Sequence, residues 1–536
     1  MLILGPSSET QTDKEITVKR TLTACIAMMA ITIGLIACAG ARPAPEAPPP
    51  RVTAQSDTGR LIHLASYDTG AEGAEIVVFN PVNQNFYVVS DYLQAIDIVN
   101  ISNPRNPTLV RRIDIAAIGQ ARGFDAGDAT SVAINVQREI IAVAIQHPDF
   151  TQNGFIVIMD FDGNYLRHYR SGVQPDMIVF TPNGEYVLTA NEGEPRDGFG
   201  PGAVDPEGSI TLVRLADSYV RTVGFHAWDN RRSELVANGV LLKPGVPPSR
   251  DLEPEYIAVT EDSRLAFVSL QENNAIAVFD MATYEFVSIR GLGVVDHSLP
   301  GNEIALHTGS QITIQNENVF GVFMPDGIAT ININGVQYIL TANEGDAREW
   351  GDFEDTHRIP IGNTPNVEAI ISEYKDGLDN NRTYLLGSRS FSIFRADTME
   401  LVFDSGSEFE RVTARMFPNN FNANHSSNAM NNRSNRKGPE PEDVQTIRVG
   451  DRIYAIIGLE RMGGVFMYDI TNPREAFYVD YINIRCFDSP FNIRTSGDLG
   501  AEGLTTIPAE LSPNGRPLIL VANEVSGTVT ILEITQ

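Results

Sequence analysis

Basic residues are scarce in this chain. Its 536 residues include 40 lysines and arginines against 68 aspartates and glutamates, which gives a formal net charge of −28 at pH 7. A nucleic-acid-binding surface needs an excess of positive charge to meet the phosphates. We therefore expect no nucleic-acid partner, and an acidic chain of this kind is better suited to cations or basic partners.

Cysteine is also rare, with three residues in the whole chain. Three cysteines cannot supply the disulfide framework that stabilises many small secreted domains. Cys25 and Cys38 belong to the N-terminal segment, so Cys486 is expected to stand alone in the folded part. That part must then depend on core packing, alone or with bound metal ions.

Sequence signatures of catalysis are missing as well. No glycine-rich phosphate loop follows a strand and opens a helix, and there is no G-x-S-x-G elbow, CxxC pair or HExxH motif. His147, His297, His357 and His425 lie in expected loops without the spacing of metal ligands. The sequence therefore offers no nucleophile and no histidine-based metal site.

A long apolar run stands near the N-terminus, at residues 21–36, directly after Lys19 and Arg20. It is short for a membrane span and typical of a signal peptide. It ends in Leu-Ile-Ala-Cys38, which resembles the lipobox of bacterial lipoproteins. We predict a lipoprotein signal peptide over residues 1–37 and lipidation of Cys38; a plain secretory signal cleaved nearby is the alternative.

The lipid on Cys38 would hold the protein to the membrane of the bacterial cell envelope, facing outward. Residues 38–58 are rich in proline and alanine. Such a composition favours an extended tether. The folded domain is accordingly expected over residues 59–536.

This remaining part contains a repeated pattern. Residues 338–345 read YILTANEG, and similar runs occur at 186–193 and 518–524. Each is an apolar, β-branched run that ends in Asn-Glu, which is typical of a buried strand with a carboxylate at its end. An earlier acid precedes each run at a similar distance, so two markers recur together and indicate a repeat.

Seven such units can be traced, each with four short apolar strands and turns between them. This pattern predicts an all-β fold, a seven-bladed β-propeller of four-stranded blades. The seventh unit ends after its third strand, and residues 61–67, before the first unit, are expected to supply its missing strand and close the ring. Insertions near 194–208, 229–250, 293–323, 346–388 and 410–437 should gather on one face.

The recurring acids should meet in space. In an antiparallel hairpin, the residue before the first strand and the residue after the second lie at the same end, so both acids of each unit should lie beside a central channel. The predicted metal ligands in this ring are Glu75, Asp176, Glu192, Glu255, Glu272, Asp326, Glu344, Glu442, Glu460, Glu502 and Glu524. Asp91 is the partner of Glu75, and the second unit has Thr130 and His147 instead.

Three interpretations of this ring are open. An oxygen-rich setting suits a hard cation, and Ca²⁺ is the candidate cofactor, with no organic cofactor expected. Alternatively, each acid caps backbone N–H groups or pairs with an arginine nearby in sequence, such as Arg196, Arg250, Arg348 or Arg461. A catalytic role for the carboxylates is the third.

A second candidate site opens the largest insertion. Asp346, Arg348, Glu349 and Trp350 form an acidic stretch with one of the two tryptophans of the chain. We consider these residues a binding loop; a solvated loop with local salt bridges is the alternative.

Several stretches together resemble a known family. They are residues 341–349 (TANEGDARE), 389–393, 437–442 (KGPEPE), 458–461 and 500–504. The chain is similar in them to the choice-of-anchor I proteins and the related mesenchyme-specific cell surface glycoproteins. The resemblance implies an extracytoplasmic β-propeller held at the cell surface by varied anchors, and relatives are often labelled alkaline phosphatase.

We therefore expect a lipid-anchored cell-surface binding module that acts through an acidic face decorated by the insertions, with an unknown ligand or surface partner. The alternative is a calcium-dependent phosphatase or phytase-like hydrolase, in which metals held by the ring polarise a phosphoryl oxygen.

Overall fold

A computed structural model describes residues 59–488 and 490–535. The signal peptide, the lipidated Cys38 and the tether predicted for residues 1–58 lie outside the described residues. The described chain is built mainly of antiparallel strands, and the prediction of an all-β fold is confirmed. In these residues no helix has the length and apolar character needed to cross a membrane.

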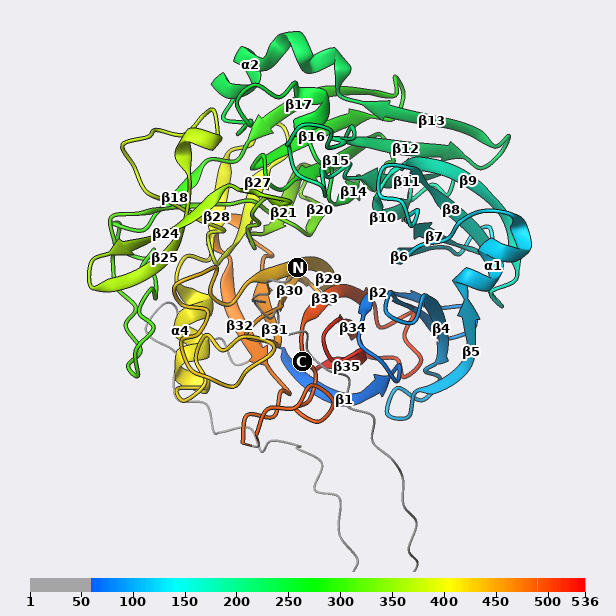
Figure 1. Ribbon diagram of the computed structural model, residues 1–536. Helices are drawn as coiled ribbons and strands as arrows, with labels where there is room; N and C mark the ends of the chain where they lie inside the picture. The colour runs from blue at the N-terminus through cyan, green and yellow to red at the C-terminus, as the bar shows by residue number, and fades with distance from the viewer. Residues whose placement is uncertain (1–58, 489, 536) are drawn as a thin grey trace, which may run out of the picture. The chain divides into compact units, whose positions relative to one another are not determined.

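Six four-stranded antiparallel sheets are each formed from strands in chain order (Figure 1). The first three sheets, with the innermost strand first, are β2 (Ala74–Asn80), β3 (Asn85–Ser90), β4 (Ala95–Asn100) and β5 (Thr108–Asp114); β6 (Ala129–Asn135), β7 (Ile140–Ile145), β8 (Asn153–Asp160) and β9 (Tyr165–Val173); and β10 (Pro175–Phe180), β11 (Tyr186–Asn191), β12 (Ser209–Arg214) and β13 (Tyr219–Gly224). The next three are β14 (Ile257–Val259), β15 (Leu265–Leu270), β16 (Ala275–Asp280) and β17 (Glu285–Gly291); β20 (Ile328–Ile333), β21 (Val336–Ala342), β27 (Phe391–Arg395) and β28 (Leu401–Asp404); and β29 (Pro441–Val449), β30 (Arg452–Leu459), β31 (Val465–Asp469) and β32 (Phe477–Ile482).

A seventh four-stranded sheet combines the first and last strands of the described chain. Its order is β33 (Ala501–Ile507), β34 (Leu518–Asn523), β35 (Thr528–Thr535) and β1 (Arg60–Asp68). β1 pairs antiparallel with β35, from Arg60 opposite Thr535 to Asp68 opposite Thr528. The segment predicted to supply the missing strand therefore pairs where it was expected.

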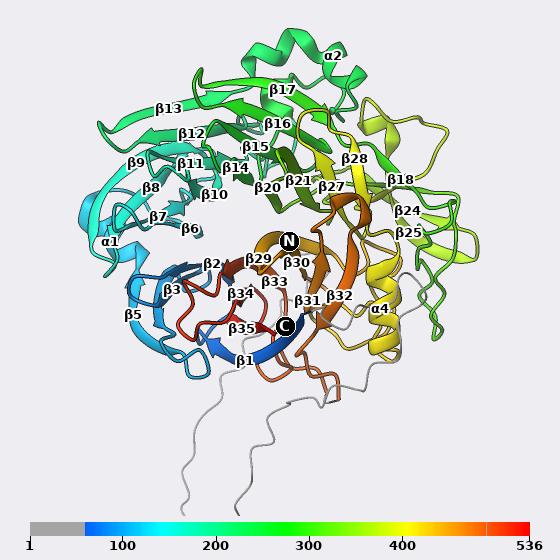
Figure 2. The ribbon, with the colours of Figure 1, turned by 180° about the vertical axis from the view of Figure 1, so that it is seen from behind.

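The sheets pack face to face around a common centre, as the views from both sides show (Figures 1 and 2). The innermost strands β2, β6, β10, β14, β20, β29 and β33 contact one another in that order, and β33 contacts β2. Apolar clusters fill the spaces between neighbouring sheets, and one of them joins Phe86 and Val88 of the first sheet to Leu520 and Ile531 of the last. This arrangement is a β-propeller.

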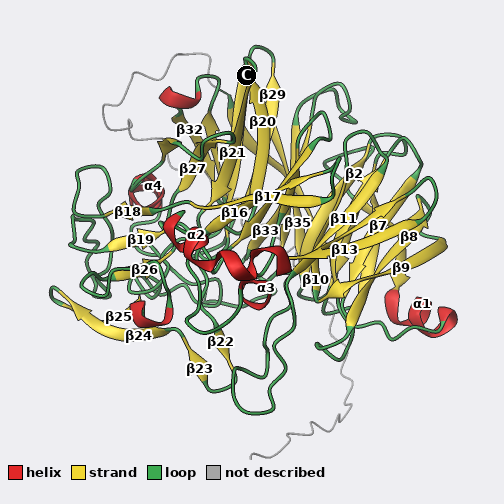
Figure 3. Cartoon of the chain, turned by 90° about the horizontal axis from the view of Figure 1, so that it is seen from above, coloured by secondary structure: helices red, strands yellow, loops and turns green. Residues whose placement is uncertain are grey.

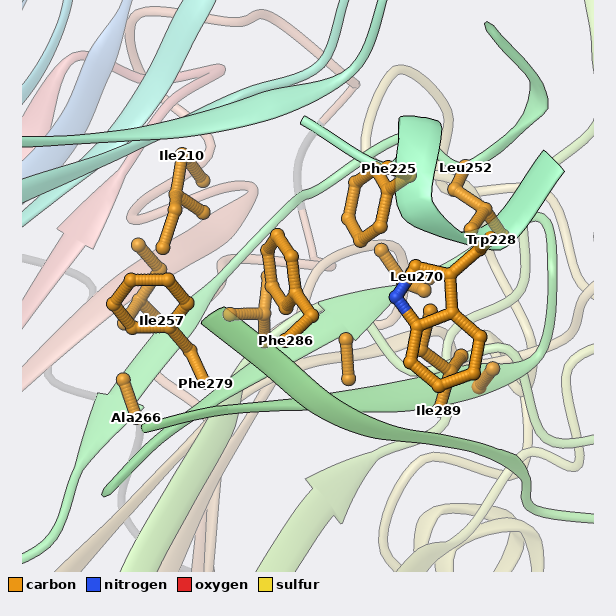
Figure 4. Packing of buried hydrophobic residues seen from close by; sticks show 14 of the residues in the cluster. Ile210, Phe225, Trp228, Leu252, Ile257, Ala266, Leu270, Phe279, Phe286 and Ile289 are labelled. Atoms are coloured by element: carbon orange, nitrogen blue, oxygen red, sulfur yellow. The ribbon is translucent and has the colours of Figure 1, made fainter. Parts of the chain in front are cut away.

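One of these apolar interfaces also anchors an insertion (Figure 4). Ile210 of β12 and Phe279 of β16 belong to the cluster between two neighbouring sheets. Phe225, which precedes the insertion, stacks on Phe286 of β17 with ring centroids 4.3 Å apart. Trp228 within the insertion is only 2% exposed. Burial of two large aromatic rings fixes this segment to the propeller.

The connections between the propeller strands, insertions included, carry the remaining short elements of the described chain. The helical elements are α1 (Ile115–Arg122), η1 (His226–Arg231), α2 (Arg232–Ala237), α3 (Pro248–Asp251), η2 (Ser372–Tyr374), α4 (Glu408–Met416) and η3 (Pro473–Glu475). The extra strands are β18 (Val294–Asp296), β19 (Phe320–Val322), β22 (Glu349–Trp350), β23 (Phe353–Glu354), β24 (Thr356–Ile361), β25 (Thr364–Ile370) and β26 (Tyr384–Leu386).

Different insertions associate with one another. β19 pairs with β18 and, in parallel, with β26, so one small sheet is built from two insertions. The Asn431 side chain donates hydrogen bonds to the carbonyls of Gly309 and Gln311, 2.7 and 3.1 Å away. Figure 3 shows α2, α3 and strands β18, β19 and β22 to β26 toward the same side of the propeller strands. Long connections that are far apart in sequence thus form a joint layer.

Cys486, the one cysteine among the described residues, is buried in the folded part.

Candidate functional site

A β-bulge directs the acid at the start of several inner strands. In β2 the register passes from Ala74 opposite Ser90 to Val77 opposite Val88, so Glu75 lies in a stretch with one residue more than its partner strand. The same register shift surrounds Asp176, Glu442 and Glu502. A bulge bends the strand and re-aims a side chain. The sequence predicted the acid at each strand start but gave no sign of the bulge.

Five of these first acids surround one cavity of about 100 Å³. They come from five successive sheets and are Asp176, Glu255, Asp326, Glu442 and Glu502. Glu75 lies on the next inner strand. Burial is the main cause of its raised pKa, and the nearby charges of Glu524 and Asp176 raise that pKa further. The side chains that the repeat places at strand starts therefore do lie together.

The acids that follow the second strands complete two compact groups. Asp176, Glu192 and Glu255 form one, and Asp326, Glu344 and Glu442 form the other; in each group one carboxylate oxygen from each residue lies within 4.8 Å of the other two. Both groups have the same origin, namely the two acids of one sheet and the first acid of the next. For this purpose the groups are called the β10 triad and the β20 triad.

Burial dominates the protonation of these carboxyl groups. It raises the pKa of Glu255, Asp326, Glu442 and Glu502 well above the ordinary value, and repulsion from neighbouring ring carboxylates raises each pKa further. Burial also raises the pKa of Asp176, to about 6. Concentrated negative charge in a poorly solvated space is unfavourable unless protons or cations neutralise it.

The cavity acids lack counter-ions in the chain itself. Among the described residues, no lysine, arginine or histidine forms an ion pair within 4.0 Å with any of the five cavity carboxylates. Glu442 is 6% exposed, and its Oε2 has no hydrogen-bond partner in the described chain. Glu272, at the end of β15, likewise has an unpartnered Oε2. A buried carboxylate oxygen without a partner is costly and suggests a ligand that is not part of the chain.

A third acidic group is neutralised by the chain. Glu344, Glu440 and Glu460 lie within 4.8 Å by their oxygens. Lys437 Nζ bonds to Glu344 and is 3.1 Å from Glu440, while Arg461 is 3.1 Å from Glu440 and 2.9 Å from Glu460. Burial alone would raise the pKa of Glu440, but Lys437, Arg433 and Arg461 hold it at about 2.

Pairing with arginine therefore explains only part of the ring. It applies to Glu460 through Arg461 and, at 4.0 Å, to Glu192 through Arg196. In the second sheet, where no acid was predicted, the Thr130 hydroxyl donates to the carbonyls of Pro175 and Asp176, 2.9 and 2.7 Å away. This contact joins two neighbouring inner strands without adding charge.

Sequence reasoning missed three residues of this site. Glu440 and Lys437 belong to the KGPEPE stretch, where only Glu442 was predicted as a ligand. His425, considered incidental, lies 3.2 Å from Glu460. The available signal was the second acid of the Pro-Glu-Pro-Glu run, but nothing in the sequence showed that the loop before it returns to the ring.

The four residues of the predicted binding loop differ in their burial. Arg348, predicted as part of the binding loop, is 1% exposed and donates to Glu253 and Asp251 at 2.9 and 3.0 Å, so its side chain is an interior one. Asp346 is half-buried with its carboxylate 3.5 Å from Lys437. Glu349 is exposed and Trp350, like Asp346, is half-buried, so these three residues remain accessible to a partner.

Comparison with known proteins defines the family. The choice-of-anchor I domain profile matches residues 75–370 and 363–473. The chain belongs to the choice-of-anchor I domain family. All six residues of the β10 and β20 triads lie within the matched parts of this choice-of-anchor I domain.

Two curated proteins are similar to parts of this choice-of-anchor I chain. Gigasin-3a of Magallana gigas is 29% identical over 180 residues, which are 32% of this chain and 63% of that protein. The mesenchyme-specific cell surface glycoprotein of Strongylocentrotus purpuratus is 27% identical over 281 residues, which are 41% of this chain and 35% of that protein. The chain thus spans less than two thirds of the length of both relatives.

Two solved structures resemble the choice-of-anchor I fold at low sequence identity. One is a chain of Kuenenia stuttgartiensis hydrazine synthase, with 10% identity, a TM-score of 0.46 and coverage of 87% of this chain and 96% of that chain. The other is the Cps50 (Swd1) β-propeller domain of Myceliophteria thermophila, with 8% identity, a TM-score of 0.43 and coverage of 87% and 99%.

Proposed function

We propose that this choice-of-anchor I domain is a closed, seven-bladed β-propeller that serves as a cell-surface binding module, and that its central carboxylate cavity binds a divalent cation, for which Ca²⁺ is the best fit. The blade count is supported by the seven four-stranded sheets. Closure is supported by the pairing of β1 with β35 and by the contact of β33 with β2.

One observation carries the cation proposal. Five ring carboxylates from successive sheets surround one cavity that Asp443 also lines, and none of these six carboxylates forms an ion pair in the described chain. Ca²⁺ takes six to eight oxygen ligands, roughly 2.3–2.6 Å away, in flexible geometry, and carboxylates are its usual donors. A bound cation would remove the repulsion that now raises the pKa of the ring acids.

The surface location is supported by family membership and by a relative. The curated sea-urchin relative is named a cell surface glycoprotein. Together with the lipobox-like run that ends at Cys38, this supports a domain that faces outward from the bacterial envelope on a lipid anchor. The exposed Glu349 and the half-buried Trp350 are then candidate contacts for a surface partner.

The hydrolase alternative receives less support. Phosphoryl transfer needs positive groups that bind the phosphate beside the metal. The residues that line the cavity include Ser131 and Tyr256 besides the acids, but no lysine or arginine. We therefore favour binding without turnover.

Calcium titration tests the proposal. Residues 59–536, freed of metal by chelation, should bind Ca²⁺ in isothermal titration calorimetry at pH 8, and saturation at 100 times Kd should raise the free energy of unfolding by about 2.7 kcal/mol. Hydrolysis of p-nitrophenyl phosphate is measured in parallel with Ca²⁺ and after chelation. Absence of calcium binding at millimolar concentration would refute the cation site, and calcium-dependent phosphatase activity would favour the hydrolase.

A further inference from the structure

We infer that the cation is held at the β20 triad, by Asp326, Glu344 and Glu442, and that the Lys437 ammonium is an internal cation that competes with it for Glu344. This inference rests on the proposed function and specifies its site. It also assigns a role to the loop that carries Lys437.

The β20 triad combines three conditions for a cation site. Its oxygens come from three different strands, at the start of β20, after β21 and at the start of β29, and they lie within 4.8 Å of one another. Asp326 and Glu442 both border the cavity, so a hydrated ion has room beside them. Glu442 Oε2 is buried with no hydrogen-bond partner among the described residues, although a buried carboxylate oxygen is normally satisfied.

Both carboxylate oxygens of Glu344 accept a hydrogen bond from a side chain. The Gln271 side chain donates to its Oε2 from 2.8 Å, and Lys437 bonds to its Oε1. The amide contact orients the carboxylate without neutralising it, whereas the ammonium competes directly for its charge. Three carboxylates provide up to six oxygens, the lower limit of calcium coordination.

The β10 triad has the same composition, and Asp176 and Glu255 also border the cavity, but it lacks the third condition, a buried oxygen without a partner. Glu192 is 4.0 Å from Arg196, and no oxygen of Asp176, Glu192 or Glu255 is both buried and unpartnered in the described residues. The β10 triad therefore supplies a control: Glu192 follows the second strand of its sheet, as Glu344 does in the β20 triad, and we expect no major ligand role for it.

Lys437 connects the site to an insertion. Its Nζ bonds to Glu344 and lies 3.1 Å from Glu440 and 3.5 Å from Asp346, and the side chain is buried. A divalent ion at the β20 triad and this ammonium would share Glu344, and two positive charges at such short separation repel each other. Because Arg433 and Arg461 also pair with Glu440, Glu440 stays neutralised when Lys437 is displaced or replaced.

Four proteins separate the alternatives: wild type and the variants Glu442→Gln, Glu192→Gln and Lys437→Met, each as residues 59–536. Calorimetric titration with CaCl₂ at pH 8 should show that Glu442→Gln weakens binding at least about tenfold, since it removes a charged ligand, whereas Glu192→Gln changes the affinity by less than about threefold. Lys437→Met should strengthen calcium binding severalfold. Circular dichroism and thermal unfolding in EGTA establish that each variant is folded.

The results distinguish this inference from the proposed function. Loss of binding in Glu192→Gln with retention in Glu442→Gln would move the cation to the β10 triad and overturn our placement, while the cation-binding function would stand. Unchanged or weaker binding in folded Lys437→Met would overturn the competition. No binding by wild type would remove the proposed function itself.

Discussion

At the scale of single residues, buried charges in this protein fall into two classes. Arg348 and its carboxylate partners Asp251 and Glu253 are buried and paired. The cavity acids are also poorly solvated but have no such partner. The paired charges are compatible with a stable folded state. The unpaired carboxylates destabilise the folded state unless a ligand neutralises them.

Replacement of Arg348 by Met should reveal the cost of the first class. It leaves two buried carboxylates without their cation, so we expect a loss of about 3–5 kcal/mol in the free energy of unfolding, measured by urea denaturation. The control is Arg214→Ala, which breaks an exposed pair with Asp217 and should lower the free energy of unfolding far less, because solvent screens exposed pairs. Equal effects of the two substitutions would show that the Arg348 network adds nothing specific.

Residue types and spacing were sufficient to predict the ring acids but not their partners. Strand-end acids such as Asp326 and Glu344 repeat with the period of the hairpins, so their meeting follows from topology. Arg348 and Lys437 lie in insertions that have no repeat, and their burial depends on how those loops return to the propeller. That information is tertiary and does not appear as a sequence pattern.

At the scale of elements, the last sheet depends on a strand from the other end of the chain. β1 covers the edge of β35, and its Leu61 packs with Leu532 and Ile534. The composition of the strands and the shortage of one strand in the seventh unit made this pairing predictable. The bulges at the inner strand starts were not predictable, because they depend on register and not on composition.

Removal of β1 tests this dependence. A chain that starts at residue 70 should be much less stable than one that starts at residue 59, because β35 loses its hydrogen-bonding neighbour and exposes an open edge that favours aggregation. Thermal unfolding and size-exclusion chromatography measure both effects. A monomeric truncated protein with an unchanged melting temperature would show that the outer strand is dispensable.

The insertions are held together by a cation–π contact. Lys243 Nζ lies 3.7 Å from the ring centroid of Phe353 and 4.4 Å from that of Phe199, and these three residues come from three separate insertions. Lys243→Ala should cost about 1–2 kcal/mol and increase hydrogen exchange in residues 194–208 and 346–388. Lys243→Arg retains a cation over the rings and serves as the control. Unchanged exchange in Lys243→Ala would mean that the insertions are held by their other contacts.

At the scale of the whole molecule, the propeller brings one acid from each of several sheets to its centre. The unfavourable repulsion between these carboxylates is therefore distributed over several sheets. No single sheet holds more than two ring acids. The architecture therefore converts a weak local feature, one or two carboxylates at a strand end, into a concentrated negative site. Its stability should then depend on protons and cations together.

The pH dependence of stability follows from the raised pKa values. Burial holds the pKa of Asp176 at about 6 and that of Glu344 at about 7 in the folded protein, above the values of unfolded carboxyl groups. The folded state therefore binds protons more tightly, so this contribution to stability is present at low pH and is lost as pH rises through about 6 to 7. Glu440, whose pKa is about 2, contributes in the opposite direction, and its contribution is lost only as pH falls toward 2.

In EGTA the melting temperature should consequently fall between pH 5.5 and pH 8, whereas added Ca²⁺ should raise it more at pH 8 than at pH 5.5, because the ion needs deprotonated ligands. Differential scanning fluorimetry across this range measures both trends. Glu442→Gln is the control, since an amide in place of this carboxyl should flatten the fall in EGTA and weaken the calcium effect. A calcium effect that is equally large at both pH values would mean that the ion binds outside the carboxylate ring.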